Sequence, residues 1–405
     1  MSYLRNVFPV PKGYSLRFYL TAATAARAGD EMSGPALLLA GLAVTGSTTD
    51  ASTLLAGITV SAAVGGPLLG ALLDRAARPG RLLAGALALY ATGLLVILAG
   101  LGRLPMACTL PLAVFTGLLG PALSGGWTAQ LPRVAADARL PRANALDAMT
   151  FGAASLAGPA LAGGVAVLLG APSAVVVSAA LITAAVPAAW RLPARGAPDR
   201  DTRPVPVAGA LAAGFRVVLR RPLLARATLT SVASCAAQGM LAACVPLLGA
   251  QLLGAAGRGV LLFSGAAVSA LAANAVLARR PLAVAPDTVV RAGALVQAVA
   301  LALAATGRPV ALVVAVLVLG VGEGPQLTAL FAVRHREAPE HLRGQVFTTG
   351  ASLKITAFAL GVAVAGPLAA WSLPGTLTLA AGTAAGGALA LGRKAFDGRP
   401  RRRVG

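Results

Sequence analysis

The sequence is short of acidic residues, histidine, cysteine and aromatic side chains. Only 13 of its 405 residues are Asp or Glu, two are His, and aromatic residues make up 4% of the chain. The three cysteines, Cys108, Cys235 and Cys244, fall inside apolar runs without metal-ligand spacing, and an odd number cannot form a closed disulfide framework. We interpret them as packing residues, and the sequence predicts no metal site.

Motifs of catalysis and nucleotide binding are missing as well. No Gly-rich phosphate loop followed by Lys-Ser or Lys-Thr is present, so ATP is not an evident energy source. No cluster of His, Asp, Ser or Cys gathers at the end of an apolar run, and we expect His335 and His341 to be solvated in the basic segment RHREAPEHLR. The sequence therefore predicts no catalytic residues, no cofactor and no enzymatic activity.

Apolar residues, in contrast, dominate the chain. They make up 57% of it against 12% charged residues, and the mean hydropathy is +0.79. The apolar runs are about 20 residues long, which fits membrane-spanning helices, whereas the strands of a barrel alternate over about ten residues. The 48 glycines favour closely packed helices. The formal charge of +21 does not indicate a nucleic-acid partner, because the chain offers almost no folded polar surface to carry a basic groove. The sequence predicts an all-α membrane protein.

Twelve apolar segments are long enough to cross a bilayer. We also expect no cleaved signal peptide, because the first 20 residues lack a compact apolar core with a small-residue cleavage site. The predicted spans are 18–45, 52–73, 82–101, 105–126, 145–170, 173–190, 227–252, 259–278, 288–307, 309–332, 345–370 and 374–392.

The basic residues of the connections favour one orientation of these spans. They concentrate in the two termini and in every second connection, while the other connections keep only Arg103, Arg258 and Arg308. Since Lys and Arg gather on the cytoplasmic side of span ends, the pattern predicts a multi-pass protein of the cell (inner) membrane with both termini in the cytoplasm.

The chain divides into two halves of six spans. The segment RLPARGAPDRDTRPVP, rich in Pro, Arg and Asp, marks a solvated linker. An Arg-rich apolar segment follows it, which predicts either an interfacial helix or a plain solvated loop. We expect an N-terminal six-helix bundle at 1–192, a cytoplasmic linker at 193–222, and a C-terminal six-helix bundle with a basic tail at 223–405.

An offset of 204 residues relates the two halves. It places GALLDR, residues 70–75, on NAVLAR, residues 274–279, and Gly120-Pro121 on Gly324-Pro325. Two such matches at equivalent places indicate a duplicated six-helix unit.

The segment GALLDRAARPGR, residues 70–81, resembles the inner-loop signature of the major facilitator superfamily, commonly written G-x-x-x-D-R-x-G-R-R. The sequence departs from it at Ala77 and by the extra Pro79. The resemblance implies twelve helices in two six-helix repeats, a central cavity lined by the first, fourth, seventh and tenth spans, and a monomer. It also implies that Gly70, Asp74 and Arg75 form a conformational latch that holds the outward-facing state. Asp74, at the membrane edge, can accept hydrogen bonds from a neighbouring helix N-terminus. A loop that only sets topology is the alternative.

In the fifth span, Gly152, Gly158, Pro159 and Gly163 resemble the Gly-Pro motif of exporters in this superfamily. Small residues there would allow tight helix packing. Because Gly-Pro recurs elsewhere in the chain, general Gly-rich packing is the alternative. Thr116 stands where many proton-coupled drug exporters carry an embedded Arg, which weakens that assignment. With PRANALDA before the fifth span and PEHLRGQVF before the eleventh, the layout resembles the branch of macrolide and siderophore exporters.

A few charged residues fall inside the spans, where each costs about 3 kcal/mol and needs a partner or a role. Arg27, Asp30 and Glu31 lie within about one turn, so Arg27 can reach either acid along the helix. These three residues and Glu323, which precedes Gly324-Pro325, are the candidates for proton coupling or substrate binding. A static pair of Arg27 with the two acids is the alternative. We expect Lys354 to snorkel to the interface.

The sequence therefore predicts a secondary active transporter that exports a small amphipathic molecule by alternating access, with protons as the exchanged ion. Its expected partners are the small-molecule substrate, protons and membrane lipid. A uniporter or importer of a small nutrient is the first alternative, and a transport-inactive membrane sensor or scaffold is the second.

Overall fold

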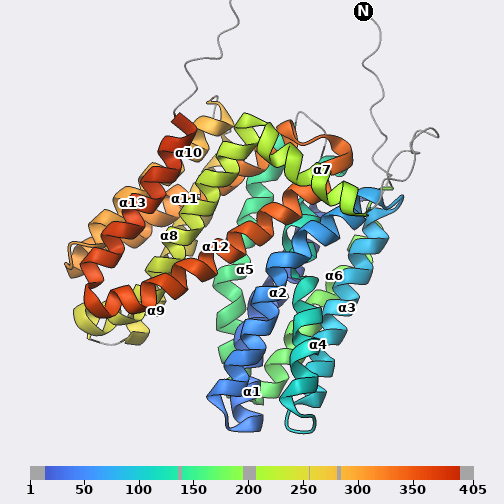
Figure 1. Cartoon of the computed structure of the whole chain (residues 1–405), viewed down its shortest axis with the longest axis horizontal. Helices are drawn as coiled ribbons and strands as arrows, with labels where there is room; N and C mark the ends of the chain where they lie inside the picture. The colour runs from blue at the N-terminus through green and yellow to red at the C-terminus, as the bar shows by residue number, and fades with distance from the viewer. Residues whose placement is uncertain (1–13, 136–138, 195–206, 255, 281–283, 393–405) are drawn as a thin grey trace, which may run out of the picture.

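The computed structural model describes residues 14–135, 139–194, 207–254, 256–280 and 284–392, which form thirteen α-helices and no strand within these ranges (Figure 1). The first six are α1 (Leu16–Thr45), α2 (Thr48–Arg75), α3 (Pro79–Gly100), α4 (Met106–Leu118), α5 (Leu140–Leu169) and α6 (Ala171–Trp190). The others are α7 (Val207–Arg220), α8 (Pro222–Leu253), α9 (Ala256–Arg279), α10 (Pro286–Ala304), α11 (Pro309–Glu337), α12 (Arg343–Trp371) and α13 (Leu373–Gly392). The predicted all-α fold is confirmed.

Twelve of these helices coincide with the twelve predicted spans, and α7 is the thirteenth. Ten spans meet both the length and the hydropathy that a membrane crossing requires over the described residues, and α4 does so together with the π-helical turn Ala122–Gly126 that follows it. The other two are α1, which carries three charges in its interior, and α13. With 14 residues, α7 is only about 21 Å long, which is too short to cross about 30 Å of hydrocarbon.

The ends of the helices follow local chemistry. The hydroxyl oxygen of Ser15 accepts a hydrogen bond from the backbone N–H of Phe18 and caps the start of α1. Gly46 ends α1 with a φ of 67°, a left-handed conformation that glycine adopts without steric cost. A proline stands in the first turn of α3, α5, α6, α8, α10 and α11, where its missing N–H would have no helical partner.

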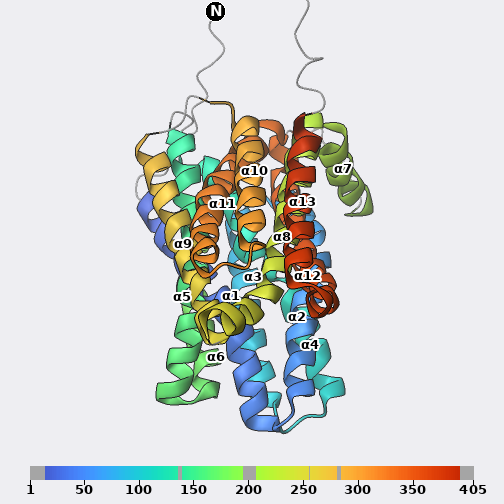
Figure 2. The same cartoon turned by 90° about the vertical axis from the view of Figure 1, so that its left-hand side faces the viewer.

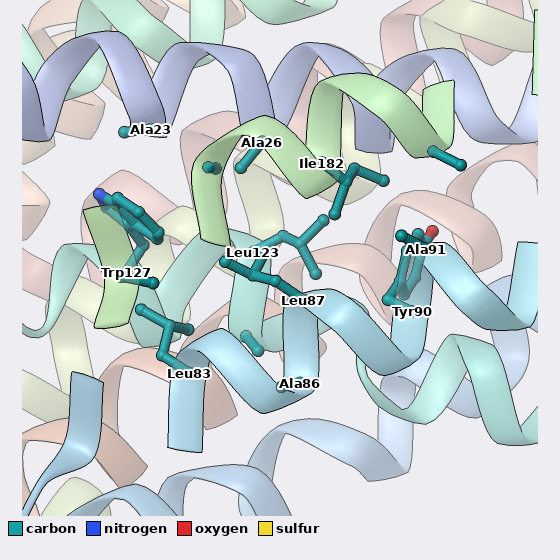
Figure 3. Close-up of a cluster of buried hydrophobic side chains, with 14 of the residues drawn as sticks. Ala23, Ala26, Leu83, Ala86, Leu87, Tyr90, Ala91, Leu123, Trp127 and Ile182 are labelled. Carbon is teal, nitrogen blue, oxygen red and sulfur yellow. The ribbon is translucent and has the colours of Figure 1, made fainter. Parts of the chain in front are cut away.

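Two large hydrophobic cores lie in different halves of the chain. The first joins side chains between Tyr14 and Leu192, and the second joins side chains between Ala237 and Ala384. Figure 3 shows part of the first core, where Leu87 and Tyr90 of α3 face Ala26 of α1 and Ile182 of α6. Each bundle thus packs around its own core.

The two bundles meet at one end of the molecule, which we call the α7 end because it holds that helix (Figures 1 and 2). The start of α1 and the end of α13 also lie there. A small core of Ala129, Ala148, Phe331 and Phe347 joins side chains of both bundles. At the opposite end, the helices of the two bundles diverge in Figure 1.

A helix, α7, occupies residues 207–220 of the predicted linker, while residues 195–206 and the basic tail 393–405 lie outside the described residues. Val218 of α7 is buried in a small core with Leu224, Ala338 and Val346. The helix therefore docks on the start of α8 and of α12. The domain boundaries at residues 192 and 223 stay a prediction.

Candidate functional site

One set of contacts between the bundles follows a stripe of α2. The carboxylate of Asp74 accepts hydrogen bonds from the backbone N–H groups of Gly344, at 2.8 Å to Oδ1, and Gln345, at 2.7 Å to Oδ2. These N–H groups belong to the first turn of α12, where helical N–H groups have no partner within the helix and the helix dipole favours an anion. The predicted contact of Asp74 with a helix N-terminus is confirmed, and the helix is α12 of the other bundle.

Further along the same stripe, Ser352 of α12 joins the two helices through its hydroxyl. It donates to the carbonyl oxygen of Ala62 at 2.6 Å and accepts from the N–H of Gly66 at 3.1 Å. Gly70 lies between these contacts and Asp74, and a Cβ there would overlap the α12 backbone at Gln345. Small residues at positions 62, 66 and 70 therefore let α2 and α12 touch.

Arg75, the third residue of the predicted latch, is exposed at the end of α2. The counterpart of this helix in the other half, α9, ends at Arg279, which is 204 positions later. Arg75 is thus placed beside the latch contact rather than within it.

Arg27 forms its ion pair with an acid of another helix and not with Asp30 or Glu31 of its own helix, so the alternative of a static pair with those two acids is wrong. Its Nη1 lies 2.9 Å from Oδ1 of Asp147 on α5, and both side chains are buried, at 2% and 0% exposure. Its guanidinium also donates to the hydroxyls of Thr128, at 2.8 Å, and Thr150, and lies over the ring of Phe151 with 3.7 Å from Cζ to the centroid. These contacts fix Arg27 between α1, α5 and the end of the fourth span.

Sequence reasoning missed Asp147. The residue lies in the PRANALDA segment, and the only signal for it was that a buried arginine needs an acid partner from some helix. Thr128 also donates to Oδ2 of Asp147 at 2.8 Å. The carboxylate is therefore held by both the arginine and a hydroxyl.

With Arg27 bound to Asp147, the two acids of α1 face different surroundings. Asp30 points toward α3, where the hydroxyl of Tyr90 donates to its Oδ1 at 2.9 Å and also lies 3.0 Å from Oγ of Ser33. Glu31 is exposed, and its backbone packs against Gly158 of α5. Of these two acids, Glu31 is therefore the one that is exposed.

The surface that Glu31 occupies can be identified from the neighbours of α1. Gly34 of α1 contacts Leu55 of α2, Gly158 contacts α1 from α5, and Gly29 packs on Ile182 of α6. Helix α3 covers the Asp30 side through Tyr90. Because α2 contacts α12 and α5 contacts α9, the remaining face of α1, between α2 and α5, turns toward the C-terminal bundle.

In the C-terminal bundle, Glu323 of α11 is half-buried and lies within electrostatic range of the ammonium group of Lys354 on α12. The thiol of Cys235 on α8 lies close to both and within hydrogen-bonding reach of Lys354. Lys354 thus has an acid of α11 and a thiol of α8 within reach, and its placement at the membrane interface stays a prediction. Cys235 is not only a packing residue, whereas Cys244 is buried in the second core.

A chain of three glutamines crosses the same bundle and was also missed. Gln238 of α8 donates to Oε1 of Gln297 on α10 at 2.8 Å, and Gln297 donates to Oε1 of Gln326 on α11 at 2.9 Å. Gln326 in turn donates to the hydroxyl of Ser234 at 3.0 Å. Because each amide satisfies the next, the chain fixes α11 beside α8 and α10 one turn from Glu323.

Two glycines of the Gly-Pro motif of α5 pack against other helices. A Cβ at Gly158 would lie 2.6 Å from Cβ of Glu31, and a Cβ at Gly152 would lie 3.3 Å from Leu271 of α9. A Cβ at Gly163 would meet nothing within 4 Å, and Pro159 is exposed. Gly158 and Gly152 therefore pack against other helices, whereas Gly163 and Pro159 do not.

The expectation for His335 is wrong. Its ring is buried in α11, and its centroid lies 4.5 Å from that of Phe347 on α12. His341 is exposed, as expected. Helix α11 extends to Glu337, three residues beyond Arg334, so the basic segment begins inside a packed helix rather than in a loop. Over the described residues there is no group of three or more His, Cys, Asp or Glu side chains that could hold a metal ion.

Residues 19–365 of the chain match the Major Facilitator Superfamily. The chain belongs to this superfamily. Members of the major facilitator superfamily, or MFS, carry small molecules, some of them with protons, and usually work as monomers. The protein is thus a multi-span membrane transporter, of a family whose members are generally not enzymes.

Among its relatives is an uncharacterised MFS-type transporter, y4rN, of Sinorhizobium fredii (strain NBRC 101917 / NGR234), which is 30% identical over 386 residues that cover 93% of each chain. The MFS fold of the chain is also that of two solved transporters of low identity. The human organic anion transporter MFSD10 (TETRAN) has a TM-score of 0.72 at 18% identity and covers 93% of this chain and 99% of its own. A bacterial homologue of the iron transporter ferroportin in the outward-facing state has a TM-score of 0.75 at 16% identity, with 93% and 98% covered.

Proposed function

We propose that this MFS transporter exports a small amphipathic molecule by alternating access, in exchange for protons. The observation that carries the proposal is the placement of two carboxylates on facing bundles. Glu31 is exposed on the face of α1 that turns toward the C-terminal bundle, and Glu323 lies on α11, the helix equivalent to the fourth span. Charges within a bilayer are costly, and carboxylates that face a water-accessible space between bundles can bind and release protons.

The basic connections support a cytoplasmic location for the α7 end in the cell (inner) membrane. Arg78 between α2 and α3, Arg280 after α9 and Arg336 near the end of α11 all lie at this end. Since basic residues near span ends stay inside, both termini are then cytoplasmic. Export consequently runs from the α7 end to the opposite end.

The contacts between α2 and α12 support an outward-facing conformation for the structure. They begin at Asp74 and end at Ala62, and all lie in the part of α2 nearer the α7 end. In the proposed cycle, Gly70 and Asp74 make the latch contact of this conformation, and Arg75 lies beside it. When the contacts of Asp74 separate, the bundles rock apart at the α7 end and expose the substrate site to the cytoplasm.

Protons are proposed to drive the return step. A carboxylic acid that is protonated from outside is neutral, so the bundles can close over it at lower electrostatic cost. Once the site faces the cytoplasm, the proton leaves, and the carboxylate is available to the outgoing substrate. We propose Glu31 and Glu323 as the groups that face the substrate, Asp30 as an acid held by Tyr90 behind them, and Arg27 as a residue that positions α1.

The proposal is tested by flux in proteoliposomes with an imposed pH gradient. The variants are D30N, E31Q and E323Q, and D287N serves as the matched control because Asp287 lies at the start of α10, where it pairs with Arg336 at 3.8 Å. We expect at least one of the three acid variants to abolish pH-driven flux while D287N retains it. If all three keep wild-type flux, the coupling proposal is wrong.

The substrate itself is found by comparing the compounds that cells with and without the protein retain. Reduced retention supports export. Accumulation inside the cells would instead support the uniporter or importer, and a purified protein without flux of any retained compound would support the sensor or scaffold.

A further inference from the structure

The C-terminal bundle buries a second cation that no acid accompanies in the described residues. Arg334 of α11 is 2% exposed, and its Nε and Nη2 have no hydrogen-bond partner there. The other buried arginine, Arg27, has Asp147, and Lys354 has Glu323 within electrostatic range. A buried charged group whose hydrogen-bond donors have no acceptor destabilises the folded protein, so an unpartnered guanidinium requires an explanation.

The two unpartnered atoms form one edge of the guanidinium. Nε–H and one N–H of Nη2 point in the same direction, which is the geometry that binds the two oxygens of a carboxylate, phosphate or sulfonate. The Phe347 ring does not satisfy this edge, because its centroid lies 5.7 Å from Cζ and a cation–π contact engages the face of the guanidinium. The free edge is therefore suited to an oxyanion.

A glycine of α12 makes room for the guanidinium itself. A Cβ at position 350 would overlap Nη2 and Cζ of Arg334, so only glycine lets the guanidinium lie against the backbone of α12. Lys354 follows Gly350 by one helical turn on the same face. Cys235 of α8 lies within electrostatic range of both Lys354 and Arg334. Two cations from neighbouring helices thus approach the same point.

The depth of this point in the bundle follows from α11. Arg334 is 11 residues after Glu323, which places it three turns, about 16 Å, nearer the α7 end on nearly the same face of the helix. Lys354 lies between them, close to Glu323. The row Glu323, Lys354 and Arg334 therefore runs from the middle of the bundle toward the α7 end.

We propose that Arg334 and Lys354 bind an anionic group of the transported molecule. This inference rests on the proposed transport function and narrows the amphipathic substrate to one with a carboxylate, phosphate or sulfonate. In the outward-facing structure the site is closed by the contacts of α2 and α5 with α11 and α12. Opening of the α7 end exposes it to the cytoplasm, where an exported anion would enter.

The test measures binding to the purified protein in detergent, so it does not depend on transport. Benzenesulfonate is the anionic probe, and phenyltrimethylammonium is a cationic probe of similar size. We expect benzenesulfonate to raise the melting temperature of the wild-type protein by about 2 °C or more at saturation, and the cationic probe to raise it less. R334Q and K354Q should each weaken the apparent affinity for benzenesulfonate by about tenfold or more.

The matched control is R336Q, because Arg336 lies on the same helix but is exposed and pairs with Glu337 and Asp287. It should bind benzenesulfonate as the wild-type protein does. R334K, which keeps the charge and loses the two-donor edge, should bind with intermediate affinity. Size-exclusion profiles and helical circular dichroism confirm that each variant is folded, and K354Q tests the site if R334Q does not fold.

Three results would overturn the proposal. The first is equal stabilisation by the two probes, and the second is benzenesulfonate binding that R334K and K354Q leave unchanged. The third is a rise in melting temperature with dihexanoyl phosphatidylglycerol but not with benzenesulfonate, which would assign the site to a lipid headgroup. Anion binding without pH-driven flux would support this site while contradicting proton-coupled export.

Discussion

The contact of Asp74 with α12 gives a quantitative prediction for the balance between the two conformations. In D74N, the side chain keeps one oxygen acceptor, but an NH₂ group replaces the oxygen that faces the second N–H. The charge that complements the N-terminus of α12 is also lost. The variant therefore removes at least one charge-assisted hydrogen bond from the closed α7 end.

The size of the effect follows from these contacts. A hydrogen bond to a charged group contributes about 1.5 to 3 kcal/mol, and a charge at a helix terminus contributes up to about 1 kcal/mol more. Because Asp74 is half-buried, we take a total near the lower end, about 2 kcal/mol. Since 1.4 kcal/mol corresponds to a factor of ten, the ratio of outward-facing to inward-facing protein should fall about 30-fold.

Distances between spin labels can measure this shift. One pair, R78C with R280C, spans the two bundles at the α7 end, and a second pair, S52C with Q251C, spans them at the opposite end. The background carries C108S, since Cys108 is exposed while Cys235 and Cys244 are buried. In D74N we expect the first pair to move apart and the second pair to approach.

A matched control comes from the other end of the same helix. Asp50 lies in the first turn of α2, where Ser47 caps the helix, and D50N leaves the contacts of Asp74 in place. It should keep the wild-type distance distributions. If D74N and wild-type protein give the same distributions for both pairs, the contact does not hold the closed conformation and the latch role is refuted.

Two further predictions concern stability. D147N should lower the melting temperature of the protein, because it leaves Arg27 as a buried charge without an acid. The loss of one partner of a buried ion pair costs about 3 to 5 kcal/mol. Thermal unfolding in detergent measures the change, and an unchanged melting temperature would contradict the buried ion pair. G158L should reduce both folded yield and flux, because a Cβ at position 158 would lie 2.9 Å from the backbone nitrogen of Met32 in α1. Its control is G163L on the same helix, where a Cβ meets nothing within 4 Å, and equal loss in both variants would show that glycine at 158 has no packing role.

The positions of the spans could be predicted because they depend on short-range properties. The predicted spans 309–332 and 345–370 lie within α11 and α12, whose bounds are Pro309–Glu337 and Arg343–Trp371. Hydropathy summed over about 20 residues needs no knowledge of neighbours. The prediction ended α11 too early, because the charges of RHRE suggested a loop although His335 packs on Phe347.

For charged side chains, the sequence could predict the chemical type of the partner but not which helix supplies it. Asp74 was expected to accept from a helix N-terminus, and the chemistry was right, but the sequence did not indicate α12. For Arg27, acids three and four residues away were the visible partners, whereas Asp147 is 120 residues distant. Lys354 has Glu323 of another helix within electrostatic range. Sequence spacing measures distance along one helix, and these pairs form across helices.

The sequence by itself determined that this is a membrane protein, with twelve apolar helices, two related halves and basic residues at one set of helix ends. Those properties follow from the free energy of transferring each segment from water to lipid, which depends only on the residues of that segment. Only the tertiary structure decided which acid meets Arg27, which face Glu31 occupies, and that Arg334 is buried with an open edge. These outcomes depend on how helices cross, and crossing is set by contacts between residues far apart in the chain.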